Sequence, residues 1–415
     1  TILEKRKLFQ NQNISEVKRI IKDVKSQKDR AILSYEKKYS KKKIKIKSLK
    51  FSKKEIGKTI KKLDKNVKKS IDTAFLRIKR FHIKQKANYF SYKDKFNNEL
   101  AYKYSPIEKV GIYVPGGTAN YPSSVLMNCI PAIVAGVKNV YMTTPCLGKK
   151  VNPGVIYAAK KCGVKEIYKI GGAHSIAAFA YGTEHIQKVN KIVGPGNSYV
   201  ASAKKEVFGD VGIDSVAGPS EVTIFADKFS NPDWVASDLI AQAEHDKFSQ
   251  SILISDSLKL IEKVKISLKN QIKQLPRRHI AQYSLENYGY LIYAKKRKNI
   301  LNLINEIAPE HLELSMKNPN KYLKDIKNAG SIFLGYYSAE AFGDYLAGPN
   351  HVLPTTGSAK FSSGLSVFDF LKRHSLIKIS KRGIESLGPL VISLAQHENL
   401  EGHANSVKIR KKKDF

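Results

Sequence analysis

The sequence has few of the features that several classes of protein require. Its three cysteines, Cys129, Cys146 and Cys162, are an odd number without CxxC spacing, which favours a reducing compartment over a disulfide framework. No apolar run reaches the roughly 20 residues of a membrane-spanning helix. The N-terminal TILEKRKLF also lacks the apolar core of a signal peptide. We therefore expect a soluble, cytoplasmic protein with no membrane partner.

Arginine is also scarce, although the formal net charge of the 415 residues is +37. Of the 73 basic residues, 62 are Lys and only 11 are Arg. Proteins that read bases or clamp phosphates prefer Arg, because its guanidinium holds a fixed fork of donors. The lysines are spread along the chain, and Ile and Asn are plentiful too. We interpret the charge as compositional drift, and a charge-driven nucleic-acid-binding protein is the less favoured alternative.

The pattern of apolar residues predicts an α/β fold. Residues 1–105 are expected to be mostly helical. From about residue 109, short apolar runs alternate with amphipathic stretches such as 124–137 and 152–162, which predicts parallel sheets with helices on their faces. The expected strands are 110–114, 139–144, 166–170 and 190–194, followed by 221–226, 249–255 and 330–335. The fold class is therefore two Rossmann-like parallel-sheet units with helical N-terminal and C-terminal extensions.

Helix signals are clearest in the N-terminal part. Ser52-Lys-Lys-Glu55 is a capping-box pattern. The apolar residues behind it recur every three or four positions and predict one helix face; they are Leu63, Val67, Ile71, Phe75 and Ile78. The predicted domains are an N-terminal extension (1–12), a first α/β domain (13–112 with 222–364), a second α/β domain (113–221) and a largely helical C-terminal extension (365–415).

Glycine-containing turns accompany the predicted strands, although none is the GxGxxG dinucleotide fingerprint. The four turns lie at 115–117, 171–174, 194–197 and 217–220. Each turn alone is consistent with ordinary turn chemistry. Because α/β sheets bind ligands at the carboxyl ends of their strands, the four together favour close backbone approach to a phosphate or a nicotinamide.

Possible metal ligands occur three residues apart in the segment that contains Gln242 and His245. Asn231 followed by proline predicts a helix start, and a helix to about residue 246 would place both side chains on one face. Asp344 and His403 would complete an oxygen and nitrogen set that suits Zn²⁺. The spacing alone leaves open a solvated helix end, and it does not show that the four residues meet.

Seven motifs, in this order and spacing, resemble those of histidinol dehydrogenases over nearly the whole chain. They are GIYVPGG, GPGN, AGPSEV, QAEHD, APEHLEL, GDYLAGPNHVLPT and GHANSV. The resemblance implies that L-histidinol is oxidised through L-histidinal to L-histidine with two NAD⁺, the last steps of histidine biosynthesis. It also implies one zinc ion per subunit, and a homodimer with shared active sites because one ligand comes from the partner subunit. The implied zinc ligands are Gln242, His245, Asp344 and His403, the last from the partner.

The resemblance also assigns residues to the reaction. Glu310 and His311 match the catalytic pair. NAD contacts are implied at Tyr113, His174 and Asn197, although a Gln is expected where this chain has His174. Substrate contacts are implied at Ser220, His351 and Glu398, together with His311 and the four metal ligands.

The implied chemistry suits these residue types. We expect His311, as an imidazole with a pKa near the working pH, to take the hydroxyl proton, and Glu310 to activate water for the aldehyde step. Both are expected near a helix start. Glu398 and His403 are five residues apart, about 140° around an ideal helix, so either Gly402 breaks the helix or the two serve different protomers. A zinc hydrolase, which needs no nicotinamide site, is the rival enzyme class.

Overall fold

The structure is a computed structural model that describes residues 13–40, 45–85, 87–116, 121–146 and 151–412. Contacts divide the chain into two compact units. The larger unit consists of Thr1–Gln85 and Glu108–Asp369, and the smaller unit consists of Lys86–Ile107 and Phe370–Phe415. The larger unit contains two parallel five-stranded sheets, and the smaller unit contains one antiparallel three-stranded sheet.

The first parallel sheet has the strand order β5-β4-β3-β6-β7. Its strands are β3 (Lys109–Tyr113), β4 (Asn139–Thr143), β5 (Glu166–Tyr168), β6 (Lys191–Val193) and β7 (Gly212–Ile213). The chain moves outward from β3 to β5 and then returns to the other side of β3. The topological switch point therefore lies between β3 and β6, where Gly111 pairs with Ile192.

The second parallel sheet repeats this connectivity, with the order β10-β9-β8-β11-β12. Its strands are β8 (Glu221–Ala226), β9 (Gln250–Ser255), β10 (Gly289–Tyr293), β11 (His311–Ser315) and β12 (Ser331–Leu334). Its switch point lies between β8 and β11, where His311 pairs with Val222. The prediction of two α/β units of similar build is confirmed, although β7, β10 and β11 were not predicted as strands.

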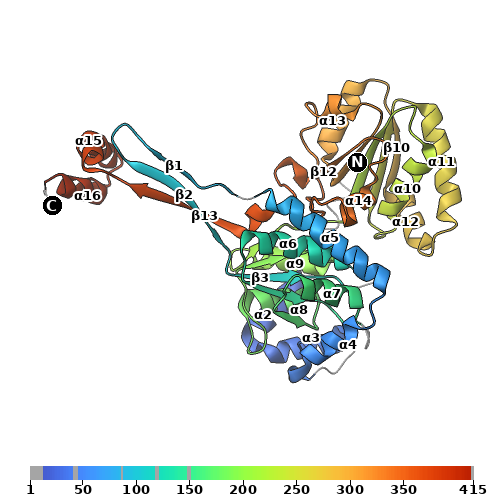
Figure 1. The fold of residues 1–415 in the computed structure, drawn as a ribbon, viewed down its shortest axis with the longest axis horizontal. Coiled ribbons are helices and arrows are strands. Elements are labelled where there is room, and N and C mark those ends of the chain that lie inside the picture. Colours follow the sequence, from blue (N-terminus) through green and yellow to red (C-terminus); the bar gives the residue numbers. More distant parts are fainter. Residues whose placement is uncertain (1–12, 41–44, 86, 117–120, 147–150, 413–415) are drawn as a thin grey trace. The chain divides into compact units, whose positions relative to one another are not determined.

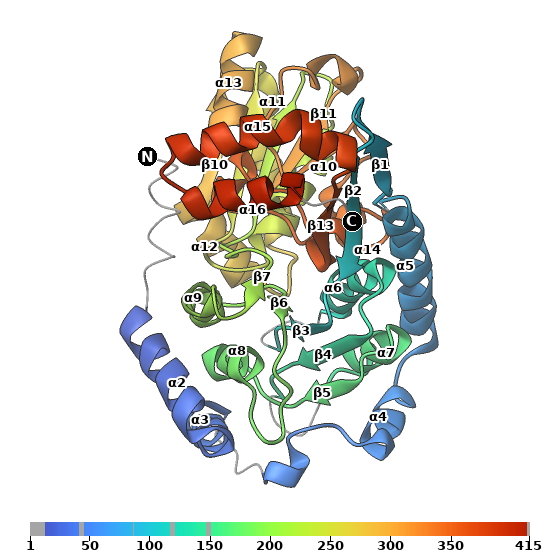
Figure 2. The same cartoon turned by 90° about the vertical axis from the view of Figure 1, so that its left-hand side faces the viewer.

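Helices cover both faces of the first sheet. Figure 2 shows α8 (Gly172–Tyr181) and α9 (Ser198–Val207) on one side, with α6 (Pro122–Ala135) and α7 (Pro153–Lys161) on the other. The predicted amphipathic stretches at 124–137 and 152–162 are thus helical. Residues of α2, such as Ile20, share a core with Ile176 and Phe179 of α8.

The N-terminal helices pack around this first sheet. They are α2 (Ile14–Gln27), α3 (Asp29–Ser40), α4 (Lys53–Ile60) and α5 (Lys65–Ile83). α2 contacts α8 and α9, and α5 contacts α6. The prediction instead grouped residues 13–112 with 222–364, and its boundary after residue 112 falls inside β3. As a division into domains, the predicted scheme stays a prediction.

The central strands β8, β9 and β11 of the second sheet are buried on both faces, as expected for a parallel sheet, whereas its edge strands β10 and β12 are partly exposed. Its helices are α10 (Pro232–Ala243), α11 (Leu258–Ile272), α12 (Arg278–Tyr288) and α13 (Arg297–Ile307), and Figure 1 shows α13 apart from the other three. In β8, Val222 and Ile224 pack in the core with α10 and α11. Phe225 packs in the core with α13. Successive side chains of the strand therefore fill opposite layers.

The capping box is confirmed, but the helix behind it is shorter than predicted. The Ser52 hydroxyl accepts a hydrogen bond from the Glu55 N–H, and Ser52 N–H donates to the Glu55 carboxylate. α4 ends at Ile60, and α5 begins after Asp64, whose carboxylate caps it. The predicted apolar face is therefore interrupted: Ile71 and Ile78 are buried in α5, whereas Val67 is exposed.

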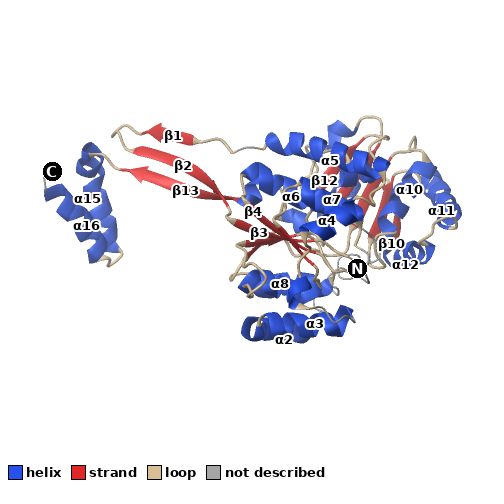
Figure 3. Ribbon diagram, turned by 60° about the horizontal axis from the view of Figure 1, so that its bottom comes forward, coloured by secondary structure: helices blue, strands red, loops and turns tan. Residues whose placement is uncertain are grey.

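Both terminal regions are mostly helical, as expected, but the smaller unit also contains strands that were not predicted. It contains β1 (Phe90–Lys93), β2 (Glu99–Pro106) and β13 (Leu371–Lys378), with α15 (Lys381–His397) packed against α16 (Glu401–Lys412), as Figure 3 shows. β13 pairs antiparallel with β2 along its whole length. This pairing joins segments far apart in the sequence, so local periodicity does not reveal it.

The remaining elements are short, and all lie in the larger unit except the end of η4. They are α14 (Glu340–Tyr345) and the 3-10 helices η1 (Ile46–Ser48), η2 (Pro319–Tyr322), η3 (Ser358–Lys360) and η4 (Val367–Phe370). Within the described part of the chain, no helix combines the length and the apolar character needed to cross a membrane.

Candidate active site

A cavity of about 490 Å³ lies in the larger unit, near the ends of strands of both parallel sheets. The first sheet lines it with residues that follow β3 and β6, such as Pro115 and Asn197. The second sheet lines it with residues at the amino ends of β8 and β11, including Ser220 and His311. The carboxyl-end rule for α/β sheets therefore describes the first sheet, whereas the second sheet presents the opposite ends of its strands.

A second cavity of about 410 Å³ adjoins the first, because Pro115 and Asn197 line both. Tyr113, His174 and Asn197 all line this second cavity. Tyr113 is the last residue of β3, His174 lies in the first turn of α8, and Asn197 caps α9 through its side-chain oxygen. The structure thus brings together the three residues at which NAD contacts were predicted.

The turn that carries Asn197 is held by a buried ion pair. Lys204, in α9, contacts the Asp214 carboxylate and donates to the Gly194 carbonyl at 3.0 Å. Asp214 accepts the Gly194 N–H at 2.8 Å. Gly194 has a φ of +114°, and a Cβ there would overlap the Tyr113 carbonyl oxygen. The pair therefore fixes the Gly194–Asn197 turn tightly against the end of β3.

The helix that carries Gln242 begins as predicted but ends sooner. The Asn231 side chain accepts hydrogen bonds from the Asp233 and Trp234 N–H groups, and α10 starts at Pro232. The helix ends at Ala243 rather than near residue 246. His245 lies in the following turn, where its N–H donates to the Gln242 carbonyl at 3.2 Å.

Gln242 is the clearest sign that this cavity holds a further group. Its side chain is completely buried, and neither the amide oxygen nor the amide nitrogen has a hydrogen-bond partner among the described residues. Leaving such a group unsatisfied costs about 1–3 kcal/mol per atom. Since Gln242 lines the cavity, a ligand or a metal ion there would satisfy its amide oxygen.

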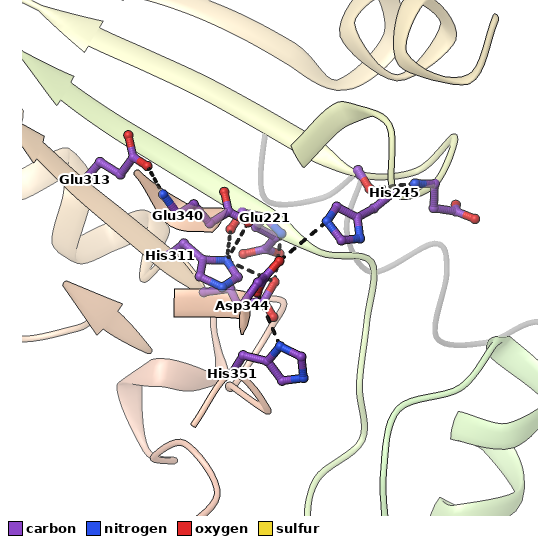
Figure 4. Close-up of polar contacts among 10 residues, drawn as sticks. Glu221, His245, His311, Glu313, Glu340, Asp344 and His351 are labelled. Carbon is purple, nitrogen blue, oxygen red and sulfur yellow. Dashed lines mark hydrogen bonds and ion pairs between the residues drawn. The ribbon is translucent and has the colours of Figure 1, made fainter. Parts of the chain in front are cut away.

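Three further donors converge near it. Nitrogen and oxygen atoms of His245, Glu340 and Asp344 all lie within 4.8 Å of one another. His245 Nε2 is 3.8 Å from Asp344 Oδ2, close to the separation of about 3.4 Å expected for two ligands on one tetrahedral zinc ion. Figure 4 shows His245 and His351 turned toward the Asp344 carboxylate. These donors and the unsatisfied Gln242 amide fit a divalent cation.

Glu310 and His311 lie at a strand start rather than at the expected helix start. His311 is the first residue of β11, because His, Leu, Glu and Leu alternate with the period of a strand. Both side chains are held by the backbone of Glu221: its N–H donates to Glu310 Oε2 at 2.8 Å, and its carbonyl accepts from His311 Nδ1 at 3.0 Å. A carbonyl only accepts, so Nδ1 carries the proton and Nε2 keeps its lone pair.

Burial shifts the pKa values of Glu310 and His311 in opposite directions. It lowers the pKa of His311 to about 4, which keeps the imidazole neutral at pH 7. It raises the pKa of the Glu310 carboxyl well above its ordinary value, against the effect of the Glu221 N–H. The expectation of a His311 pKa near the working pH is therefore corrected, because the ring is almost completely buried.

Asp344 is held in its charged form by the imidazoles around it. Burial works in the opposite direction, but His351, His311 and His245 together lower the pKa of Asp344 to about 2. His351 Nδ1 is 3.4 Å from Asp344 Oδ1. The cavity therefore contains an anionic oxygen beside imidazole nitrogens, which are donor types that a divalent cation binds.

Several acidic residues of this site were missed by the sequence analysis. Glu340 lies one helical turn before Asp344 in α14, and Glu313 lies two residues after His311 in β11. These spacings, i to i+4 in a helix and i to i+2 in a strand, were readable signals. Glu313 Oε1 accepts the Glu340 N–H at 2.8 Å, and Glu313 shares a hydrogen bond with Asp238 of α10. Asp238 therefore links α10, which carries Gln242, to the strand of His311.

Glu398 and His403 belong to the smaller unit and are not among the residues gathered in the cavity. Glu398 is the C-cap residue that follows α15, and His403 lies in the first turn of α16; both are exposed. The break between them comes at Asn399, which has a φ of +59°, and not at Gly402. The two residues thus lie on different helices, which removes the constraint of a single straight helix.

The fold and the cavity together define a two-sheet α/β enzyme with a buried Glu-His pair beside cation-binding donors. A family model described as histidinol dehydrogenase matches residues 3–411. The chain is 58% identical over 410 residues to a histidinol dehydrogenase of Pelagibacter ubique, covering 99% of this chain and 95% of that one. It is 48% identical over 396 residues to one of Listeria monocytogenes, covering 95% and 92%.

A solved structure agrees with these sequences. The crystal structure of histidinol dehydrogenase from Elizabethkingia anophelis matches with a TM-score of 0.92 and 39% identity, over 96% of this chain and 92% of that one. The chain belongs to the histidinol dehydrogenase family, and it is therefore an oxidoreductase that acts on a CH–OH group.

The Asp238–Glu313 pair predicts a dependence of stability on pH. A hydrogen bond between two carboxyl groups needs a shared proton, and burial raises the pKa of Asp238 to about 6. Between about pH 4, the unfolded value, and pH 6, the folded protein binds more protons than the unfolded chain, so this pair loses stability as the pH rises. Asp238→Asn should therefore gain in melting temperature relative to the native sequence from pH 4.5 to 6.

The measurement is thermal unfolding of metal-free protein at several pH values. Glu262→Gln, which changes an exposed carboxylate of α11, is the matched control and should show no such trend. A constant difference between Asp238→Asn and the native sequence across this pH range would contradict the shared proton.

Proposed function

We propose that the chain oxidises L-histidinol through L-histidinal to L-histidine with two NAD⁺, in the last steps of histidine biosynthesis. The observation that carries this proposal is the convergence of Glu310, His311 and the cation-binding donors on one cavity. The names of the relatives support the choice of substrate. A reaction of four electrons at one site needs a base for an alcohol and an activated water for an aldehyde, and the cavity offers a residue for each.

Zinc, one ion per subunit, would be held by Gln242, His245 and Asp344, with His403 supplied by a second copy of the chain. The unsatisfied amide of Gln242 and the 3.8 Å approach of His245 to Asp344 support this set. Bound zinc supplies a Lewis acid that accepts the imidazole and amine nitrogens of histidinol and so positions the carbinol carbon.

His311 is the proposed base for the alcohol step. Because Nδ1 donates to the Glu221 carbonyl, the lone pair of Nε2 is the acceptor for the hydroxyl proton. As that proton moves to Nε2, hydride leaves the carbinol carbon for the first NAD⁺ and the aldehyde forms. The carboxyl groups of Glu340 and Glu310 lie 3.6 and 3.7 Å from His311 Nδ1, and the anionic Asp344, whose charge acts to raise the pKa of His311, stabilises the imidazolium that results.

Glu310 is the proposed base for the aldehyde step. Its raised pKa makes the carboxylate a stronger proton acceptor than an exposed one. It would take a proton from water as the water oxygen adds to the aldehyde carbonyl, while His311 Nε2 returns its proton to the carbonyl oxygen, so that a gem-diol forms. Hydride then leaves this carbon for the second NAD⁺ as His311 Nε2 takes one hydroxyl proton, and the acid product releases its remaining proton to solvent as the carboxylate.

The remaining contacts follow the two cavities. NAD⁺ would contact Tyr113, His174 and Asn197, which line the second cavity. Histidinol would contact Ser220 and His351 in the first cavity, and also Glu398. Because acidic side chains line the site, we propose no specific nucleic-acid partner.

We propose a homodimer with shared active sites, located in the cytoplasm. The smaller unit supports this, because it exposes large apolar side chains that a second copy would cover. Ile377 of β13 is 70% exposed, and Leu390 and Leu394 of α15 are 62% and 64% exposed. The same unit carries His403, the ligand assigned to the neighbouring site.

The stoichiometry of the reaction tests the proposed function directly. With limiting L-histidinol and excess NAD⁺, absorbance should show two NADH formed per histidinol, and L-histidine should accumulate. One NADH per histidinol would reject the second oxidation. Hydrolysis without NADH would favour a zinc hydrolase instead.

The shared site predicts complementation between two inactive variants. His245→Ala removes a ligand from one side of the site, and His403→Ala removes one from the other, so each homodimer should lose zinc and activity. After co-refolding, mixed dimers contain one intact site and should recover up to about a quarter of native activity in a statistical mixture. Zinc analysis of each variant is the companion measurement. If no mixture regains activity, each chain builds its own site.

The assignment of His311 to the alcohol step and Glu310 to the aldehyde step predicts that their variants affect the two steps differently. Glu310→Gln keeps the shape of the side chain but removes its basicity, so histidinol should still be oxidised to the aldehyde while the second step slows by about 10²–10⁴-fold. His311→Asn should slow the first step as well. Single-turnover NADH formation, measured separately with histidinol and histidinal, distinguishes the variants. Equal slowing of both substrates by Glu310→Gln would reject the assigned roles.

A further inference from the structure

The N-terminal helix α3 reaches the second cavity through one acidic side chain. Glu36 Oε1 lies 2.8 Å from His174 Nε2 and also accepts the Gly171 N–H, the cap of α8, at 3.2 Å. Both side chains are almost completely buried, at 2% and 4% exposure. Glu36 and His174 nevertheless line the cavity. The contact therefore joins an element outside the sheet to the residue at which a cofactor contact was predicted.

The hydrogen-bond pattern fixes which nitrogen of His174 carries the proton. Glu36 Oε1 accepts a hydrogen bond from the Gly171 N–H, so this oxygen presents a lone pair rather than a proton to its neighbours. The proton between the two side chains therefore belongs to His174 Nε2, and Glu36 accepts it. In a neutral ring, Nδ1 is then a pure acceptor.

The acceptor nitrogen lies next to a glycine of the cavity lining. Nδ1 lies 3.6 Å from the position that a Cβ would take at Gly172, another residue of the cavity lining. Among the described residues, no hydrogen bond is made to this nitrogen. The absence of a side chain at Gly172 leaves Nδ1 accessible to a ligand.

Two tyrosines of α3 hold the ring in plane. Tyr35 and Tyr39 stack on His174 with ring centroids 5.9 and 6.3 Å away. Tyr39 is itself fixed by a hydrogen bond of 2.7 Å from its hydroxyl to Glu16 of α2. Ring rotation would break both the stacking and the Glu36 hydrogen bond, so the direction of Nδ1 is set by α3.

We propose that Glu36 is a positioning residue for the nucleotide site, holding His174 so that Nδ1 accepts a hydrogen bond from a ribose hydroxyl of NAD⁺. This inference rests on the proposed function. It also accounts for the residue type: a Gln at position 174 offers a carbonyl acceptor without help, whereas a His offers one only if its other nitrogen keeps the proton. Glu36 supplies that condition in this chain.

A double-mutant cycle on full-length protein tests the proposal. Calorimetric titration with NAD⁺ gives the Kd, and steady-state kinetics gives the KM values for NAD⁺ and histidinol and the kcat. Glu36→Ala should raise the Kd and KM for NAD⁺ about tenfold, with kcat at saturating NAD⁺ and the KM for histidinol little changed. Glu36→Gln keeps an acceptor oxygen and should stay within about threefold. In a His174→Gln background, Glu36→Ala should add less than about twofold.

Asp29→Asn is the matched control. Asp29 lies on the same helix and accepts a similar hydrogen bond, of 2.7 Å, from His185 Nδ1, but it lines neither cavity. This variant should leave the Kd for NAD⁺ unchanged. An unchanged Kd in Glu36→Ala, or the same increase in both backgrounds, would overturn the positioning role.

A second measurement covers the case in which Glu36→Ala does not fold. In ¹⁵N-histidine-labelled native protein, the His174 signals should show a protonated Nε2 and an unprotonated Nδ1. In Glu36→Gln, the preference for this tautomer should weaken. A native His174 protonated at Nδ1 would refute the proposal. Failure of the proposed function itself has a different signature, because the native protein would then not bind NAD⁺ at all.

Discussion

The backbone of one residue, Glu221, organises the chemistry of this molecule. Its N–H donates a hydrogen bond to the Glu310 carboxyl group, and its carbonyl accepts one from His311 Nδ1. One residue of the backbone therefore orients two adjacent side chains, one as an acceptor and the other as a donor. This is possible because β8 and β11 are neighbouring parallel strands that both begin at the cavity. The pairing of the two strands therefore sets the tautomer of His311 without any further side chain. A shift of register by one residue would turn His311 into the opposite layer.

The two sheets share one connectivity but present different ends to the cavity. The first sheet offers the turns after its strands, where glycine lets the backbone approach a ligand closely. The second sheet offers its strand starts, which place Glu310, His311 and Ser220 opposite those turns. The two cavities therefore adjoin, with Asn197 and Pro115 in both linings, and we propose that one takes the nucleotide and the other the proton transfer. The α3 helix adds Glu36 to the lining of the second cavity, so the N-terminal helices do more than cover the sheet.

The electrostatics of the site oppose those of the whole chain. The protein has a formal net charge of +37, yet the cavity and the layer behind it contain Glu310, Glu313, Glu340, Asp238 and Asp344. Burial raises the pKa of most of these carboxyls, whereas the three imidazoles around Asp344 lower its pKa. The Asp344 carboxylate therefore stays anionic where a cation is proposed to bind. The raised pKa values favour a shared proton between Asp238 of α10 and Glu313 of β11, and Glu313 also accepts the N–H of Glu340 in α14.

Sequence periodicity determined the α/β class, most strands of the two sheets and the start of α10 at Asn231, because those features depend on neighbours a few residues away. The motifs also pointed to His311, Gln242 and Asp344, since each residue type has limited chemistry. Only the tertiary structure decided that β13 pairs with β2, that the second sheet uses its strand starts, and that Glu36 meets His174. These contacts join segments 135 or more residues apart, and the pKa values of Glu310 and His311 follow from burial that no local pattern encodes.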